Sequence, residues 1–435
     1  MRVSINTLIS IAFFLIFYTA FQGGRYFMAN RIQELGLLLS LMLFFYGAVV
    51  SSLNVKDKDL KWNWWFFATI FFIAYTFILP AYVFSRNADV AMLPSVMASR
   101  EFLIVFFGPA IYFLYRIGYD IRTVERVFTA ALVFLAFNYL FHYFRMDLSA
   151  AYNSPNHTVA ALVTHDPWRG YRLKPSSFAL FTLSILAPFL MITSKGILKK
   201  LAWFIIVLIL AYIWFLVKAR AMAASLIICT MMYPFFFAKK NRLGLLFFAL
   251  PIMIIGLFTI MMIVTERMAQ GGANDAVRLR SYSIAWESIK ETPFLGFGQQ
   301  SNYTKTEQDI FWYKFYSADI GIIGVAFKYG FIGVAVYIFF SVFLVMRLVQ
   351  TIWLYKYAYG RINPVMFSIL VVLLTQLLNI MLNTTLIFIQ GLSLASFTIG
   401  ITAVWRHKIL KEFPELAKKS RKTSVAGSQL AESPG

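Results

Sequence analysis

The chain has 435 residues, of which 60% are apolar, 18% aromatic and only 14% charged. A soluble domain carries about a quarter charged residues, so this composition excludes an ordinary soluble protein. The formal charge of +21 would suggest nucleic acid as a partner of a soluble protein, but basic loops also orient membrane proteins, and we favour that interpretation. The single cysteine, Cys229, excludes an intrachain disulfide and a cysteine metal cluster.

Apolar runs recur along the chain, and many reach the roughly 20 residues needed to cross a bilayer. We therefore predict an all-α, polytopic transmembrane helix bundle over residues 1–410, followed by a partly disordered tail over 411–435. The first run precedes TAFQGGRY, which has no good cleavage site, so we interpret it as a retained helix. The twelve predicted spans are 5–21, 34–53, 64–84, 102–117, 127–145, 176–194, 201–217, 221–238, 243–264, 320–345, 364–383 and 386–404.

The positive-inside rule gives these spans an orientation. An even number of spans places both termini on one side, and the loops on that side are mostly short and hold more Lys and Arg than the opposite set. We predict a multi-pass protein of the bacterial inner (cytoplasmic) membrane with both termini in the cytoplasm. The two long loops, 146–175 and 265–319, are then extracytoplasmic. Because functional residues concentrate in loops held by a rigid scaffold, we expect the site residues there.

An amphipathic helix is predicted within loop 265–319, in NDAVRLRSYSIAWESIKETPFLGFG. It begins near Asn274 or Asp275 and ends before Pro293 and the following glycines. A helix lying at the membrane interface accounts for an apolar stripe, but it does not account for Arg278, at the edge of that stripe. Helical spacing places on the stripe Leu279, Tyr282, Trp286 and Ile289, opposite Arg280, Glu287 and Glu291.

Arg220 stands in FLVKARAMAASL, at the outer end where the seventh span turns into the eighth. An arginine here is either an interfacial anchor whose side chain reaches the headgroups or part of a diphosphate clamp. A guanidinium suits the second role because it is planar, permanently charged and matches phosphate oxygens with two parallel hydrogen bonds. A site that neutralises a diphosphate without a metal needs more than one such group.

Asp319 stands where the second long loop meets the tenth span. A carboxylate in this position is either solvated or held by tight helix packing, which the glycines that follow it favour. Lys328 lies nine residues further along and should face protein or water rather than lipid, with Glu34 or Asn379 as candidate partners. Such a pairing could also be purely structural. The glycines are Gly321, Gly324, Gly330 and Gly333.

The sequence contains no motif for nucleotide binding or for a metal site. No segment has the glycine-rich form that cradles nucleotide phosphates, and no cytosolic segment is long enough for a nucleotide-sugar-binding domain. We therefore expect neither a metal nor a cofactor. Zinc-ligand spacing is absent among the four histidines, which are His142, His157, His165 and His407.

Three segments resemble the superfamily of O-antigen ligases and polysaccharide polymerases, which are integral membrane glycosyltransferases that act on undecaprenyl-diphosphate-linked glycans. KARAMAASL is similar to the family's segment of Ser or Thr, Arg and small residues, with Arg220 at the arginine and Ala219 replacing the hydroxyl. VRLRSYSIAWESIKETPFLGFG is similar to the family's arginine, an aromatic residue four positions on, then Pro and Gly-x-Gly. These positions are occupied by Arg278, Tyr282, Pro293, Gly296 and Gly298.

The third segment, SADIGIIGVAFKYGFIG, resembles the ligase pattern of a histidine, a small polar residue, nine unspecified residues and Gly-x-x-Gly. Gly330 and Gly333 are in register, but Asp319 stands at the histidine and Ile320 at its polar neighbour. This departure favours a repeat-unit polymerase over a ligase. The resemblance covers roughly residues 170–340.

The resemblance implies transfer of a glycan from undecaprenyl diphosphate to a hydroxyl of an acceptor glycan. Arg220 and Arg278 would stabilise the departing diphosphate, with Arg172 or Arg280 as a third group, and Asp319 would orient or deprotonate the acceptor hydroxyl. Expected partners are the lipid-linked donor, the acceptor glycan, membrane lipid and a chain-length regulator, without nucleic acid. Alternatives are an O-antigen ligase, a polysaccharide or lipid transporter, and a structural subunit of an assembly machine.

Overall fold

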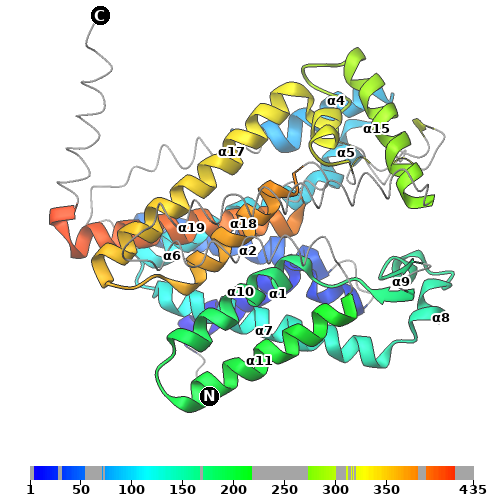
Figure 1. Ribbon diagram of the computed structural model, residues 1–435. Helices are drawn as coiled ribbons and strands as arrows, with labels where there is room; N and C mark the ends of the chain where they lie inside the picture. The colour runs from blue at the N-terminus through cyan, green and yellow to red at the C-terminus, as the bar shows by residue number, and fades with distance from the viewer. Residues whose placement is uncertain are drawn as a thin grey trace, which may run out of the picture.

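The computed structural model describes residues 4–27, 32–53, 71, 74–166, 170–217, 273–299, 310, 311, 315, 317, 320–380 and 388–416. These residues are mostly helical, and their helices lie side by side in one bundle (Figure 1). The bundle helices are α1 (Ile5–Ala20), α2 (Ile32–Leu53), α6 (Phe107–Arg116), α7 (Ile121–Arg145), α10 (Ser177–Thr193), α11 (Ile197–Val217), α17 (Gly321–Tyr359), α18 (Pro364–Leu378) and α19 (Ile389–Glu412).

Shorter elements connect or flank these helices. The 3₁₀ helix η1 spans Gly23–Phe27 and follows α1. A π-helix, η2 (Ala74–Ile78), leads into α4 (Leu79–Asn87), and α5 (Met92–Ala98) leads into the 3₁₀ helix η3 (Ser99–Phe106). The remaining elements are α8 (Leu148–Tyr152), α9 (His157–Ala160), the strands β1 (Val163–Asp166) and β2 (Gly170–Leu173), and α15 (Ala273–Glu291).

Four of the described helices are long and apolar enough to cross a bilayer, which supports a membrane protein. They are α7, α11, α17 and the part of α2 from Glu34 to Leu53, and α1, α10 and α18 are shorter apolar helices. The predicted spans 221–238 and 243–264 lie outside the described residues. The number of twelve spans therefore stays a prediction, as do the division at residue 410 and the tail.

The structure corrects two predicted spans. The span predicted at 102–117 is two elements, η3 and α6, rather than one regular helix. The span predicted at 320–345 continues to Tyr359, because the chain reaches its helix-ending residue only at Gly360, which has φ +68°. Hydropathy predicts only the apolar part of this helix, whereas the helix itself ends at Gly360, whose backbone is in the left-handed conformation.

Aromatic side chains from four helices form the centre of the bundle. Phe17 of α1 is buried, and its ring centroid lies 5.1 Å from that of Phe107 in α6, 4.9 Å from Phe128 in α7 and 5.0 Å from Phe397 in α19. Edge-on contacts of this kind add to the free energy of burying each ring. The first apolar run thus packs into the centre of the bundle.

A buried carboxylate joins three helices at one end of the bundle. Glu125 of α7 accepts hydrogen bonds from Asn363 Nδ2 at 2.6 Å, immediately before α18, and from Trp405 Nε1 at 2.7 Å, in α19. Ser10 of α1 bonds Tyr119 at the same end, at 2.7 Å between their hydroxyl oxygens. The start of α1 and the end of α19 therefore lie together, at what is here called the terminal end of the bundle (Figure 1).

The opposite end, here called the loop end, carries η1, loop 146–175 and α15 (Figure 1). Loop 146–175 contains an antiparallel hairpin in which Val163 pairs with Leu173 and Thr164 with Arg172. The all-α prediction is therefore wrong for this loop. The two strands have four residues each and alternate weakly between apolar and polar side chains, so they give little periodic signal in the sequence. In the structure, the ring of His165 lies 4.4 Å from that of Tyr171 on the paired strand and stabilises one face of the hairpin.

Replacing Glu125 with Ala should lower the free energy of unfolding by roughly 2–4 kcal/mol, because two buried donors lose their acceptor. Glu125→Gln keeps a side-chain carbonyl oxygen and should lose less. Thermal unfolding of the protein in lipid nanodiscs, followed by tryptophan fluorescence, measures both changes. Equal midpoints for wild type and Glu125→Ala would contradict this account of the terminal end.

Candidate functional site

Helix α15 confirms the predicted helix in the second long loop, and the face that packs on the protein includes part of the predicted apolar stripe. Ala285 and Ile289 are buried against α17, whereas Leu279 and Trp286 are each 47% exposed. The packed face also includes Ser281, which is 1% exposed. Tyr282 and Ile289 of the predicted stripe pack on the protein, whereas Leu279 and Trp286 face outward, and the small residues Ser281 and Ala285 allow α15 to approach α17 closely.

Helix α17 is interrupted at Gly330, which has φ +66° and ψ −172°. In an unbroken helix the Phe331 amide would bond the Phe327 carbonyl. Instead the Phe331 amide donates to the Pro293 carbonyl at 2.8 Å, and the Phe327 carbonyl accepts from the Phe297 amide at 2.6 Å. The Lys328 carbonyl accepts from the Gly298 amide at 3.1 Å. The segment after α15, Pro293–Gly298, thus supplies the hydrogen bonds that the break removes.

Two glycines are required where this segment meets its neighbours. A Cβ at Gly330 would collide with the backbone of Phe294, and its positive φ disfavours any other residue. Gly298 has φ +101°, and a Cβ there would collide with the backbone of Phe84 in α4. The Pro and Gly-x-Gly positions therefore fix the segment between the break in α17 and helix α4.

Several charged side chains interact at the loop end, between elements that are far apart in the sequence. Glu34, one of the two candidate partners of Lys328, forms an ion pair with Arg100, at 2.8 Å between Oε1 and the guanidinium. A contact of Lys328 with the other candidate, Asn379, stays a prediction. Lys328 is 6% exposed and interacts electrostatically with Glu101, whose carboxylate accepts the Ile389 amide at the start of α19. These contacts join α2, η3, α17 and α19 at the loop end.

Arg172 of β2 lies in a group of polar contacts at the loop end. Its guanidinium donates to the Val217 carbonyl, at 3.3 Å, at the end of α11. It also interacts electrostatically with Tyr139 of α7, whose hydroxyl donates to the Leu173 carbonyl at 3.4 Å. Arg172 is thereby tied to the last residue of α11, which precedes Arg220 by three sequence positions.

Two residues of η1, Arg25 and Tyr26, belong to the same region and were not among the predicted site residues. The Tyr26 hydroxyl donates to the Lys174 carbonyl, after β2, at 2.8 Å, and the Tyr26 ring stacks on His142 at 5.3 Å. Burial raises the pKa of the Tyr26 hydroxyl, and the neighbouring Arg25 opposes that rise. Burial also lowers the pKa of Arg25, which donates to Gln22 Oε1 at 3.0 Å. An arginine beside Gly-Gly in a short loop between the first two predicted spans is the signal in the sequence that could have indicated them.

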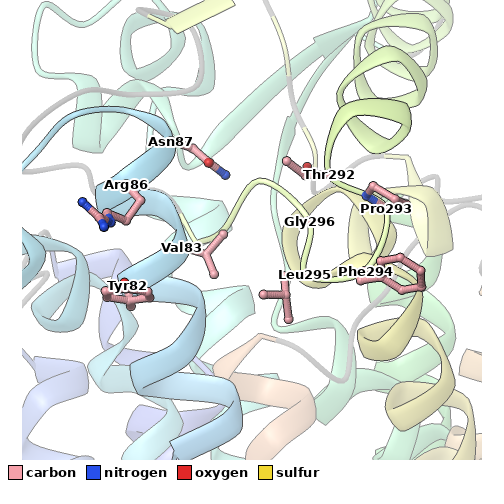
Figure 2. Close-up of a pocket in the computed structure, with 9 residues that line it drawn as sticks. All are labelled: Tyr82, Val83, Arg86, Asn87, Thr292, Pro293, Phe294, Leu295 and Gly296. Atoms are coloured by element: carbon pink, nitrogen blue, oxygen red, sulfur yellow. The ribbon is translucent and has the colours of Figure 1, made fainter.

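A surface pocket of about 380 Å³ lies between α4 and the segment that follows α15 (Figure 2). Figure 2 shows Tyr82, Val83, Arg86 and Asn87 projecting from α4 on one side and the turn from Thr292 to Gly296 on the other. The Asn87 amide donates to the Phe297 carbonyl at 3.1 Å, which holds the two sides together.

Only some of the predicted site residues lie in the part of the chain that the structure describes. Arg220 and Asp319 lie outside the described residues, and only the backbone of Arg278 is described, in the second turn of α15. Arg280 is exposed on α15, and Arg172 is partly buried on β2, both at the loop end. Convergence of these groups therefore stays a prediction. Within the described residues, no three His, Cys, Asp or Glu side chains gather as metal ligands.

The part of the chain that contains α15 and the segment after it matches a known protein family. Residues 176–338 match the O-antigen ligase family. This match confirms the resemblance inferred from the three motifs, and it runs from α10 through α15 into α17, eight residues past the break at Gly330. A search of curated proteins gives no match to the chain. The O-antigen ligase match and the apolar helices together support a glycosyltransferase-like membrane enzyme with glycan and lipid substrates.

Replacing Gly330 with Ala should lower the free energy of unfolding by about 2–4 kcal/mol, since the new methyl group meets backbone atoms that cannot move away. Gly360→Ala is the matched control, because Gly360 has a similar φ of +68° but nothing within 4 Å of an added Cβ. The control should lose only about 1–2 kcal/mol of backbone strain. Thermal midpoints in nanodiscs compare the two, and equal losses would mean that the clash with the Pro293–Gly298 segment is unimportant.

Proposed function

We propose that this protein polymerises oligosaccharide repeat units on the outer face of the bacterial inner membrane. The donor is a glycan linked to undecaprenyl diphosphate, and the acceptor is a sugar hydroxyl of a second glycan. The O-antigen ligase match over residues 176–338 carries this proposal. The proposal also takes both termini as cytoplasmic, so that the loop end faces outward.

The contacts of Arg172 support a diphosphate site at the loop end. Its bond to the Val217 carbonyl joins the hairpin to the end of α11, three positions before Arg220 in the sequence. Two guanidinium groups brought to one place can divide the charge of a diphosphate between them. Arg25 would add a third positive charge to the same region, because its neighbour Tyr26 is bonded to the Lys174 carbonyl beside β2.

The reaction breaks the bond between the donor's anomeric carbon and the diphosphate oxygen and forms a bond from that carbon to the acceptor oxygen. Arg220 and Arg278, with Arg172 or Arg280, stabilise the negative charge on the departing lipid diphosphate. Asp319 takes the proton of the acceptor hydroxyl as a general base. The diphosphate is already a good leaving group, so the protein needs neither a metal nor a cofactor for this step.

Asp319 at the position of the ligase histidine is the observation that favours a polymerase over an O-antigen ligase. The two differ mainly in the acceptor, which is a growing glycan for a polymerase and a lipid-anchored core for a ligase. A transporter would place its functional charges in the middle of the membrane. The contacts of Lys328 with Glu101, and of Glu34 with Arg100, fit structural pairs instead.

Arg278→Ala should abolish polymer formation while the protein remains inserted, because the diphosphate loses a paired contact. Arg278→Lys should lose at least about tenfold in rate, since an ammonium cannot make two parallel bonds. Lys290→Ala is the control on the same helix, where Lys290 pairs only with the exposed Glu287 at 2.8 Å. Gel analysis of surface glycans and a transfer assay with purified protein test this, and normal polymer from Arg278→Ala would remove Arg278 from the site.

Deleting the protein distinguishes the two candidate activities. Loss of a polymerase should leave single repeat units on the lipid carrier. Loss of an O-antigen ligase should instead leave long chains on the carrier that never reach their final anchor. Mass spectrometry of extracted lipid-linked glycans makes the comparison, and an unchanged glycan profile would contradict both activities.

A further inference from the structure

Helices α17 and α19 pack together and bring two arginines close to each other, near the terminal end of the bundle (Figure 1). Arg347 of α17 and Arg406 of α19 repel each other electrostatically. The Arg406 guanidinium donates to Gln350 Oε1 at 3.4 Å, and Gln350 lies three positions after Arg347, on the same face of α17. Further along, the rings of Tyr355 and Trp405 join the same two helices, with centroids 4.8 Å apart. The two arginines are therefore neighbours across a packed helix interface.

Neither arginine has an acidic partner among the residues that the structure describes. Helices α17 and α18 contain no Asp or Glu, and the single acidic residue of α19, Glu412, is bonded to a tyrosine hydroxyl at 2.5 Å. The contacts of the two guanidinium groups are neutral, with the Phe343 ring 5.2 Å from Arg347 and a side-chain amide beside Arg406. Like charges held together cost free energy, above all where one of them is partly buried, as Arg406 is. An anion between the two groups would offset that cost.

Both arginines lie where the apolar part of their helix ends. Arg347 follows the predicted span 320–345 by two positions, and Arg406 follows the predicted span 386–404 by two positions. Long basic side chains at such positions reach the headgroups of the nearer leaflet. The positive-inside rule accounts for an arginine at the end of each helix. It does not account for two that face each other, because separate anchors avoid this repulsion.

The face of α17 that carries Arg347 also offers an apolar row to a lipid chain. Phe339 and Phe343 precede Arg347 at intervals of four residues, so the three side chains lie in one row along the helix. The Phe339 ring is 71% exposed and stacks on Phe343, with centroids 6.4 Å apart. The row thus passes from aromatic rings inside the predicted span to a guanidinium just beyond it. A phospholipid has the same order, with its acyl chains in the hydrocarbon layer and its phosphate at the interface.

We propose that Arg347 and Arg406 bind the phosphate group of an anionic phospholipid, one acyl chain of which lies along Phe339 and Phe343. A pair of guanidinium groups suits a phosphodiester, because each can form two parallel hydrogen bonds with its oxygens. Basic sites between membrane helices bind anionic headgroups in this way. The lipid would join α17 to α19 on the far side of the bundle from the break in α17. This site goes beyond the proposed function, since it involves neither the glycan nor the loop end.

The test measures phospholipid binding to the full-length protein in detergent by native mass spectrometry. The probes are dioleoyl phosphatidylglycerol and dioleoyl phosphatidylcholine, which share acyl chains and a phosphodiester but differ in net charge. Wild type should prefer phosphatidylglycerol, because the arginine pair repels the choline cation. Arg347→Ala and Arg406→Ala should each bind phosphatidylglycerol at least about tenfold more weakly, because a hydrogen bond between charged groups is lost. Arg126→Ala is the matched control, an arginine near the same end that bonds Arg122 and Thr123 of its own helix, at 3.2 Å each.

Thermal unfolding in nanodiscs gives a second measurement. Replacing phosphatidylcholine with phosphatidylglycerol should raise the midpoint more for wild type than for either arginine variant, because a ligand stabilises the folded state only where it binds. If Arg406→Ala does not fold, Arg347→Ala carries the test, since Arg347 is exposed.

Three results would overturn the proposal. Equal binding of phosphatidylglycerol by wild type and both arginine variants would mean that the pair holds no lipid. An equal loss in Arg126→Ala would reveal a general effect of positive charge. Displacement of phosphatidylglycerol by an equal concentration of glycerol 3-phosphate would make the pair a site for a soluble phosphate compound. Because no glycan is present, these results do not depend on whether Arg278→Ala abolishes polymer.

Discussion

The break in α17 at Gly330 is the constraint on which the loop end depends. Inside a membrane protein, backbone groups freed from a helix need partners, because lipid provides none. The amides of Phe297 and Gly298 and the carbonyl of Pro293 supply those partners. The segment after α15 is consequently held in place by the helix that it repairs, and neither can be moved without exposing unpaired backbone.

This arrangement positions the second long loop without a separate domain. Ala285 and Ile289 pack α15 against the first part of α17, and the Asn87 amide fixes the next segment to α4. The basic region around Arg172 is held by other means, through hydrogen bonds from Tyr26 and Tyr139 to the chain around β2. Two independently supported regions thus lie at one end of the bundle, where the proposed reaction would need a rigid frame.

The existence of most helices could be predicted from the sequence, because uncharged apolar runs of about 20 residues rarely occur outside membrane spans. The packed face of α15 could be predicted only in part, since Tyr282 and Ile289 lie on the apolar stripe, whereas the small residues Ser281 and Ala285 complete the contact without adding to the periodicity. The partner of Lys328 also stays a prediction, because hydropathy gives the depth of a residue but not its neighbour across the bundle: of its two candidates, Glu34 pairs with Arg100, and a contact with Asn379 is not tested. The hairpin at 163–173 was missed because its strands have four residues each.

Composition and hydropathy by themselves predicted a helical membrane protein, and motif spacing predicted its resemblance to O-antigen ligases near residues 170–340, which the family match over 176–338 confirms. They identified Pro293, Gly296, Gly298 and Gly330 as a pattern without saying why these residues occur together. Only the tertiary structure decided that, since the reason is a set of hydrogen bonds between residues about 30 positions apart. The pocket beside α4 likewise exists only after folding, because its two walls are distant in sequence and become neighbours through packing.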